Sequence, residues 1–241
     1  MATESVGGEP PGTALALPQL SLAALFVTAL VTAQVTASKV VAVALPVSLP
    51  VTGDAILVPA AVFAYALTFF ASDCYTELYG KRAAQLLVNV AFLMNFVLLA
   101  LVWLAVWAPI APVSDVGQEP FAQTLAASTG VVAGSLLAYI VSQNWDVLVF
   151  HRLREYTAGE HLWLRNVVST ATSQFVDTVI FITVAFLLFQ GLPLDAVLTL
   201  VVGQYLFKLA LVALDTPFVY LVVGLVRSRT ATDPAAAPGG D

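Results

Sequence analysis

Long apolar runs, separated by short segments rich in proline, glycine or charged residues, dominate the sequence. About 20 apolar residues are needed to cross the hydrocarbon core of a bilayer as a helix. Six runs meet this requirement: Leu20–Leu45, Ala55–Ser72, Ala83–Trp107, Phe121–Phe150, Asn166–Phe189 and Leu194–Val226. The pattern predicts an all-α integral membrane protein whose six transmembrane helices form one bundle.

The two ends of the chain differ from this apolar centre. Residues 1–18 are rich in glycine, proline and glutamate, and residues 230–241 in alanine, proline and glycine. Such segments bury too little apolar surface to fold by themselves, so we expect disordered tails around one membrane domain over residues 19–229. The first 18 residues contain no Lys or Arg, which argues against a cleaved signal peptide.

Composition agrees with a membrane protein. Hydrophobic residues make up 60% of the chain and charged residues 10%, whereas a soluble domain carries about 25% charged residues. The net charge of -6 argues against nucleic acid as a partner, because that would need a basic surface.

The positions of the basic residues predict the orientation in the membrane. Seven of the nine lie in the links after the second and fourth spans or after the sixth: Lys81, Arg82, Arg152, Arg154, Arg165, Arg227 and Arg229. Lys and Arg near span ends are retained on the cytoplasmic side during insertion. We therefore expect a multi-pass protein of the cell membrane with both termini in the cytoplasm.

A short internal repeat links the fourth and fifth spans. The stretches that begin at Ser142 and Ser173 both read Ser-Gln-x-x-Asp-x-x-x-Phe. A glutamine and an aspartate three residues apart share one helix face. At 1.5 Å per residue, both glutamines lie about 12–14 Å from the inner interface. Asp177 is then expected nearer the midplane, level with Tyr139, and Asp146 nearer the cytoplasm.

These polar residues admit two interpretations. Buried amides can simply join helices, at roughly 0.6 kcal/mol each. Two glutamines and two carboxylates exceed what helix pairing needs, and each carboxylate costs roughly 2.5–3.5 kcal/mol at the centre of the bilayer. We therefore expect a binding site that contains Gln143, Asp146, Gln174, Asp177, Tyr139 and Lys208. In this site Lys208 neutralises a carboxylate on another helix, for which Asp177 has the matching depth.

Other polar residues leave their roles open. Asp73 and Glu77 share one face at the inner end of the second span, before Gly80. They are either part of a locally paired helix end or an inner gate or coupling site. The roles of Lys39, Asn89, Asn95 and Asp215 are not determined by the sequence, although Lys39 could reach the outer interface.

The residue types indicate a class of ligand rather than a reaction. Amides both donate and accept, and a carboxylate accepts two donors side by side, which suits a planar, neutral heterocycle. Aromatic neighbours such as Tyr139, Trp145 and Phe175 could stack on its faces.

Catalytic and nucleotide-binding motifs are not found. The sequence has no Gly-x-x-x-x-Gly-Lys-Ser/Thr, no His-Glu-x-x-His and no Gly-x-Ser-x-Gly. Asp146 and Asp177 are predicted at different depths, which argues against a protease dyad. Two histidines without a cysteine cluster are weak evidence for a metal. We expect no enzyme, no catalytic residue, no metal and no cofactor.

Several motifs resemble a known family. Asp73 to Gly80 matches the Asp-x-x-Thr-Glu-x-Tyr-Gly signature of the queuosine precursor transporters, the VUT family. Gly53 with Pro59, the Ser-Gln-x-x-Asp stretch of the fourth span, and Trp163-Leu164-Arg165-Asn166 through Gln174 and Asp177 are also similar to it. The resemblance covers roughly residues 20–226. It implies a six-helix fold distantly similar to the substrate-binding subunits of energy-coupling-factor vitamin transporters.

The resemblance also implies a function. The chain would import a 7-deazaguanine, such as 7-cyano-7-deazaguanine, for tRNA modification, without an ATPase of its own. The alternative is a substrate-capture subunit of a vitamin or heterocycle transporter that a separate ATPase module drives. A third interpretation is a structural membrane protein whose polar groups only join helices. The exact substrate, a coupling ion and homo-oligomerisation stay open.

Overall fold

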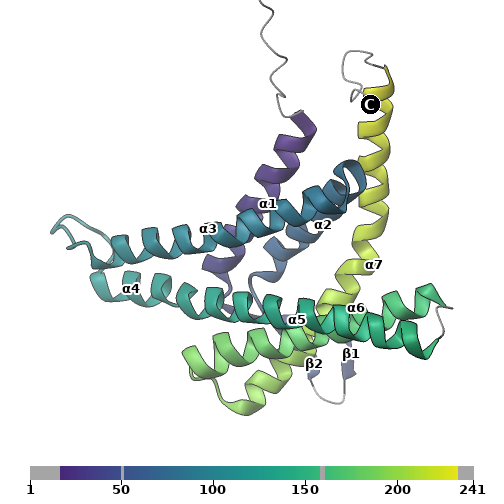
Figure 1. The fold of residues 1–241 in the computed structure, drawn as a ribbon. Helices are drawn as coiled ribbons and strands as arrows, with labels where there is room; N and C mark the ends of the chain where they lie inside the picture. The colour runs from purple at the N-terminus through teal and green to yellow at the C-terminus, as the bar shows by residue number, and fades with distance from the viewer. Residues whose placement is uncertain (1–16, 50–51, 158–160, 233–241) are drawn as a thin grey trace, which may run out of the picture.

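The computed structural model describes residues 17–49, 52–157 and 161–232. Its elements are α1 (Leu17–Thr36), β1 (Val40–Leu49), β2 (Gly53–Pro59), α2 (Val62–Tyr79), α3 (Lys81–Trp107), α4 (Gln118–Ala126), α5 (Ser128–Tyr156), α6 (Leu162–Ile182), the π-helical segment η1 (Thr183–Phe189) and α7 (Leu194–Thr232). Figure 1 shows α6 lying along α5, and the C-terminal half of α7 passing close to α2.

Five helical stretches in the described part of the chain are long and apolar enough to cross a membrane. They are Leu17–Thr36, Lys81–Trp107, Gln118–Tyr156, Leu164–Phe189 and Leu194–Ser228. They match five of the six predicted spans. The helix at the second predicted span, α2, has 18 residues, and its last two turns contain Asp73 and Glu77, which lower its hydropathy. The predicted count of six spans is therefore not confirmed.

A β-hairpin replaces the predicted end of the first span and the start of the second. Val40 pairs with Pro59 and Ala44 with Ala55 in antiparallel register. Valine at alternate positions fits the pleated surface of a strand better than a helix. Val41, Val43 and Leu45 thereby lie on one face and pack against a cluster that includes Ile56 and Val58. The first helix consequently ends at Thr36, not at Leu45.

The hairpin packs closely on the last helix. Gly203 of α7 lies against the backbone of Leu57 in β2, where a Cβ atom would overlap the Leu57 carbonyl group. The side chain of Phe207, one turn further along α7, packs against the apolar face of the hairpin. A glycine at position 203 is therefore what allows strand and helix to approach each other.

Several predicted boundaries shift. The fourth span is divided into α4 and α5 at Ala127, and α5 continues six residues beyond Phe150 to Tyr156. The fifth begins four residues early, at Leu162, and ends in η1. Helix α1 begins at Leu17, and α7 continues to Thr232. Residues 17–18, the last two of the predicted N-terminal tail, and residues 230–232, the first three of the predicted C-terminal tail, are therefore helical. The rest of both tails lies outside the described residues.

Two glycines form tight corners between helices. Gly80 has φ 84° and its N–H donates to the Thr76 carbonyl oxygen at 2.9 Å, which ends α2 directly before α3. Gly191 has φ 68° in the link between η1 and α7. A positive φ costs glycine little, so both chain reversals need few residues.

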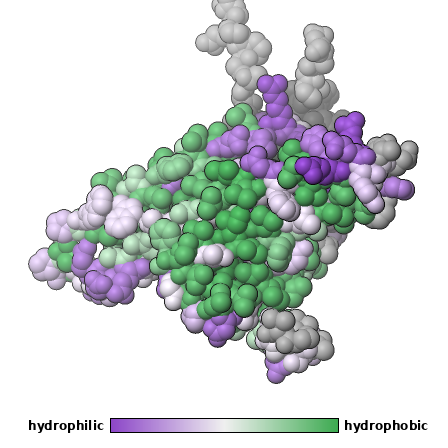
Figure 2. Space-filling model, turned by 60° about the horizontal axis from the view of Figure 1, so that its bottom comes forward, coloured by the Kyte–Doolittle hydropathy of each residue, from purple (hydrophilic) through white to green (hydrophobic). Residues whose placement is uncertain are grey.

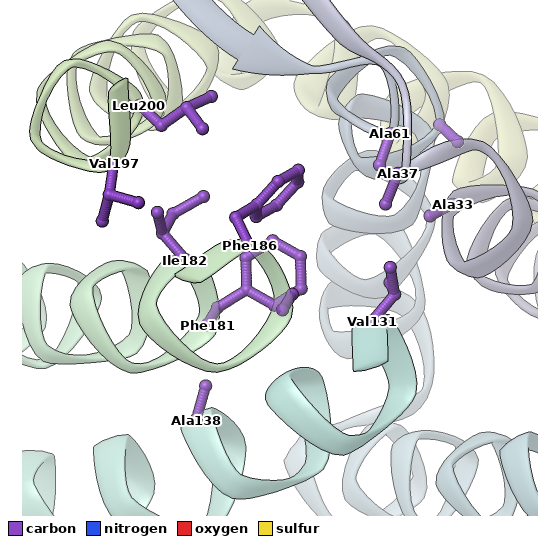
Figure 3. Close-up of a cluster of buried hydrophobic side chains, with 12 residues drawn as sticks. Ala33, Ala37, Ala61, Val131, Ala138, Phe181, Ile182, Phe186, Val197 and Leu200 are labelled. Carbon is purple, nitrogen blue, oxygen red and sulfur yellow. The ribbon is translucent and has the colours of Figure 1, made fainter. Parts of the chain in front are cut away.

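The largest apolar cluster forms around the junction of α6 and η1. Ile182 points toward Val197 and Leu200 of α7, and the rings of Phe181 and Phe186 extend from the other side of the same helical turn (Figure 3). Small residues from the other helices complete the cluster: Ala33 and Ala37 near the end of α1, Ala61 before α2, and Ala138 of α5. Their small side chains let helix backbones come close, as is usual in membrane proteins.

The outer surface is largely apolar. Figure 2 shows a broad hydrophobic area with hydrophilic residues gathered at its borders. On α3, the large residues Leu86, Leu93, Phe96, Leu101 and Leu104 are all exposed. An exposed apolar surface of this extent is stable in lipid rather than in water.

Candidate functional site

A cavity of about 280 Å³ lies at the predicted site. Residues from α1, α2, α3, α5, α6 and α7 line it: Phe26, Leu30, Tyr65, Thr68, Phe69, Ser72, Val88, Phe92, Ser135, Ala138, Tyr139, Ser142, Gln143, Gln174, Asp177, Phe181, Gln204 and Lys208. Small-molecule pockets usually measure about 300–1,000 Å³ and combine an apolar wall with a few polar groups. The cavity is slightly smaller than this range and has that composition.

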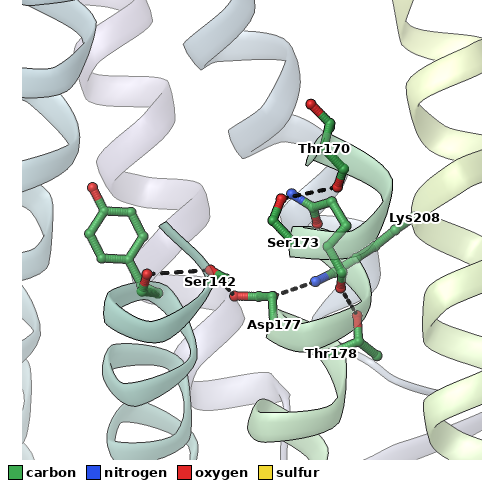
Figure 4. Close-up of polar contacts among 8 residues, drawn as sticks. Ser142, Thr170, Ser173, Asp177, Thr178 and Lys208 are labelled. Atoms are coloured by element: carbon green, nitrogen blue, oxygen red, sulfur yellow. Dashed lines mark hydrogen bonds and ion pairs between the residues drawn. The ribbon is translucent and has the colours of Figure 1, made fainter. Parts of the chain in front are cut away.

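An ion pair is the strongest polar contact in the cavity wall. The Lys208 Nζ atom donates to Asp177 Oδ2 at 2.6 Å, and the two side chains are 11% and 24% exposed. Figure 4 shows Asp177 of α6 between Ser142 of α5 and Lys208 of α7. This confirms the pairing that was predicted from the depths of the two residues. A buried charge needs such a partner, because an unpaired one is costly at this depth.

The internal repeat forms a reciprocal contact between two antiparallel helices. The Ser142 hydroxyl of α5 donates to Asp177 Oδ1 at 3.4 Å, and the Ser173 hydroxyl of α6 donates to Asp146 Oδ1 at 3.3 Å. Each repeat thus supplies one serine donor and one carboxylate acceptor to the other. The four-residue spacing of Ser and Asp places them one turn apart on one face, as this exchange requires.

The structure does not bring Asp146 to the cavity. Its carboxylate lies at the α5–α6 contact with Ser173, and Asp146 is not part of the cavity lining. The physical reason is its position one helical turn from Ser142, toward the end of α5, where the two helices face each other. Five of the six predicted binding residues therefore meet at the cavity, and Asp146 stands apart.

Unpaired amides are the second polar feature. Gln143 of α5 and Gln174 of α6 both line the cavity, and neither side chain has a hydrogen-bond partner among the described residues. Gln204 of α7 adds a third amide. It is 3% exposed, and its Oε1 atom has no hydrogen-bond partner among the described residues. The three amides come from three different helices. They leave hydrogen-bonding capacity that a ligand could use.

The aromatic lining differs from the predicted one. Tyr139 lines the cavity, its ring packing on Phe92 with centroids 4.2 Å apart and its hydroxyl accepting from Gln85 Nε2 at 2.8 Å. Trp145 and Phe175 are not in the lining; both are exposed, and Phe175 packs against the Tyr205 ring. Their helix faces point outward, because they lie one or two residues beyond the cavity-facing glutamines.

Helix α2 contributes residues that the sequence analysis missed. Tyr65, Thr68, Phe69 and Ser72 follow the spacing of one helix face and line the cavity together. The recurrence of polar and aromatic residues at helical spacing within an apolar segment could have predicted this lining face. It was hidden because the predicted second span began at Ala55, where the chain is a strand.

The predicted gate residues are not among those that line the cavity. Glu77 is in the last turn of α2, where the Arg227 Nη2 atom donates to the Glu77 carbonyl oxygen at 2.9 Å and lies 3.8 Å from its carboxylate. Both side chains are exposed. Arg227 of α7 therefore provides the compensating charge that an acidic helix end requires. Asp73, one turn before Glu77, is exposed.

Residues whose roles were left open have varied surroundings. Asn89 accepts a hydrogen bond from Gln85 at 3.1 Å on α3. Asn95 is 1% exposed, with no partner for its side chain among the described residues.

Asp215 is the one charged residue in a second hollow, of about 350 Å³, between α2 and α7. That hollow is larger but almost wholly apolar, so it suits a hydrogen-bonding ligand less well. The Lys39 carbonyl oxygen, directly before β1, accepts from the Ala60 N–H, directly after β2.

The arrangement can bind a small molecule but has the features of no catalytic centre. No cluster of three or more His, Cys, Asp or Glu side chains able to hold a metal occurs within residues 17–49, 52–157 and 161–232. The cavity wall contains one cation and one anion, with free amides and aromatic rings around them. Such a wall selects a ligand by hydrogen bonding and shape.

Comparison with known proteins identifies the family. Residues 59–222 match the family model described as "Putative vitamin uptake transporter". The chain is also 36% identical over 166 residues to a Bacillus subtilis (strain 168) protein named "Probable queuosine precursor transporter", which covers 65% of this chain and 67% of that protein. No solved structure matches this chain. The family match covers more than half of the chain and includes five of the six cavity-lining helices. With its long apolar helices, the chain is a multi-pass membrane protein and belongs to the VUT family, which is a family of transporters and not of enzymes.

Proposed function

We propose that this chain imports a neutral 7-deazaguanine that serves as a queuosine precursor, such as 7-cyano-7-deazaguanine, for tRNA modification. The observation that carries the proposal is the cavity in which Gln143, Gln174 and the Asp177–Lys208 pair meet. The name of the Bacillus subtilis relative supports the same class of cargo.

The charges of the cavity favour a neutral cargo. Asp177 and Lys208 are the charged lining residues, and their formal charges cancel. A cargo with a net charge would lack a counter-charge at a depth where unpaired charges are strongly disfavoured. A neutral ring avoids this cost and can still bond to both members of the pair.

Shape and polarity favour a planar ring with a mixed hydrogen-bonding edge. Tyr65, Phe69, Phe92 and Tyr139 give the cavity aromatic surfaces on which a flat ring can stack. The volume of about 280 Å³ suits a small heterocycle. In our proposal Gln143 and Gln174 hold the ring edge, Asp177 accepts ring N–H groups, and Lys208 balances its charge. Asp146 has the supporting role of joining α5 to α6.

We further propose that both termini are cytoplasmic and that the membrane is the cell membrane. The seven flanking basic residues support this orientation, since they fall at the helix ends that would then be inside. Asp73 and Glu77 would accordingly lie at the cytoplasmic end of α2. There they form the inner gate or coupling site, which Arg227 of α7 contacts through Glu77.

Ligand-dependent stability tests the proposed cargo. The purified protein is heated in detergent with 7-cyano-7-deazaguanine, guanine, adenine, thiamine or biotin. A ligand at 100 times its dissociation constant adds about 2.7 kcal/mol to the free energy of unfolding, so the deazaguanine should raise the unfolding temperature and the two charged vitamins should not. Stabilisation by a vitamin alone would overturn the proposed cargo.

A second candidate function has support from the description of the matching family as vitamin uptake transporters. In it, the chain only captures substrate, and a separate ATPase module drives transport. Lipid vesicles that contain this chain alone separate the two candidates. Uptake of labelled 7-cyano-7-deazaguanine into such vesicles, without ATP, supports the importer. Binding without uptake, together with co-purification of an ATPase from cells, supports the capture subunit.

A further inference from the structure

The Asp177–Lys208 pair has unequal hydrogen-bonding capacity left on its two sides. Asp177 Oδ2 is bonded to Lys208 at 2.6 Å, and Oδ1 to the Ser142 hydroxyl at 3.4 Å. An ammonium group has three N–H donors, and Asp177 is the partner of Lys208 among the described residues. Both residues line the cavity. Lys208 therefore has two unused donors at the wall, whereas each carboxylate oxygen already has one partner.

This imbalance limits which ring edges can bind. An edge with only N–H donors can compete for Asp177, but it leaves the free donors of Lys208 facing other donors. An edge that has a carbonyl oxygen beside an N–H group satisfies both residues while the ion pair stays closed. A guanine-type ring presents this arrangement, because its carbonyl oxygen stands next to a ring N–H.

We propose that Lys208 is a specificity-determining residue that donates to the ring carbonyl of the cargo, while Asp177 accepts from the neighbouring ring N–H. This deepens the proposed function and rests on it. The two residues act as one donor–acceptor unit and select a lactam ring, in which carbonyl and N–H are adjacent. The free amides of Gln143 and Gln174 then serve the remaining polar groups of the ring.

A pair of ring probes isolates the carbonyl contact. 7-Cyano-7-deazaguanine and its 6-thio analogue have the same N–H donors, but sulfur is a weak hydrogen-bond acceptor. A hydrogen bond from a charged donor contributes enough to change affinity about ten- to hundredfold. Titration calorimetry on the purified wild-type protein should therefore give a dissociation constant at least about tenfold higher for the thio analogue.

Two variants connect this preference to Lys208. In the double variant Asp177→Asn, Lys208→Met, an amide oxygen remains to accept the ring N–H, and no charge is left unpaired. Its oxo-to-thio affinity ratio should fall to about 1, because the carbonyl has lost its charged donor. The matched control Lys208→Arg retains a charged donor and should retain a clear preference for the oxo ring.

Each outcome decides the inference. An unchanged oxo-to-thio ratio in the double variant, or a wild-type protein that binds both rings equally, overturns it, and the proposed cargo stands in both cases. If the wild type binds neither ring, the proposed function fails and the role of Lys208 fails with it. If the double variant does not fold, Lys208→Gln, a neutral donor, replaces it and should reduce the ratio relative to Lys208→Arg; an equal ratio in these two overturns the inference.

Discussion

At the scale of single residues, the carboxylate of Asp177 connects three helices. It belongs to α6, accepts from Ser142 of α5 and pairs with Lys208 of α7. A change at this position therefore acts on the fold and on the cavity at once. Separating the two effects requires variants that restore the charge balance without restoring the ion pair.

We expect Asp177→Asn to reduce uptake more than it reduces the amount of folded protein in the membrane. The single change leaves Lys208 buried without a counter-charge, which costs about 3–5 kcal/mol. Adding Lys208→Met should recover most of the folded protein, because no charge is then unpaired, while uptake stays low. Thermal unfolding and uptake are measured on the same preparations. Recovery of full uptake in the double variant would assign the pair to structure alone.

The reciprocal serine contacts provide a matched pair of variants. Ser142→Ala and Ser173→Ala each remove one hydroxyl donor to a carboxylate on the facing helix. Each should lower stability by a similar amount, about 0.5–1.5 kcal/mol. Ligand affinity should fall only in Ser142→Ala, since that serine contacts Asp177 in the cavity wall. Equal losses of affinity in both variants would contradict the assignment of Asp146 to helix pairing.

Much of the site could be predicted at this scale, and the failures have physical reasons. Helix period and depth were enough to pair Asp177 with Lys208 and to place Gln143 and Gln174 together. They placed Asp146 and Asp177 at different depths, but they could not exclude Asp146 from the site, because the repeat gives both carboxylates the same spacing from a serine and a glutamine. What distinguishes them is the lysine of α7, which reaches only one of the two carboxylates.

At the scale of elements, the hairpin was the feature that the sequence pattern concealed. Residues 40–49 are apolar except for Ser48, so alternation of polar and apolar positions could not reveal a strand. The β-branched valines and Pro46 were the remaining signs. The single-glycine corners at Gly80 and Gly191 were predictable, because Gly80 precedes Lys81 and Gly191 stands two residues before Pro193, and both patterns are typical of a helix end.

Two glycines of α7 test the contact between hairpin and helix. Alanine is favoured over glycine inside a helix by about 1 kcal/mol. Gly224→Ala should gain stability up to that amount, because no atom lies within 4 Å of the added Cβ. Gly203→Ala should lose stability instead, since its Cβ would overlap the Leu57 carbonyl group. Thermal unfolding of both variants measures the difference. A gain in both would show that β2 and α7 separate readily.

At the scale of the whole molecule, the orientation can be tested with thiol labelling. Cys74 is the single cysteine of the chain and is 0% exposed, so it gives a low background. Asp115 and Arg152 are exposed near opposite ends of the α4–α5 unit. An impermeant maleimide should modify Asp115→Cys in intact cells and Arg152→Cys only after permeabilisation. The reverse pattern would contradict cytoplasmic termini.

The cancelling charges of Asp177 and Lys208 also bear on the energetics of a transport cycle. Moving one elementary charge through a membrane voltage of 100 mV is worth about 2.3 kcal/mol. The membrane voltage does no work on a binding site with no net charge, either when the site is empty or when it holds an uncharged ring. Voltage acting on this site therefore cannot concentrate the ring inside the cell. Accumulation would depend on a coupled gradient elsewhere in the molecule, or on the rapid chemical consumption of the ring after its release.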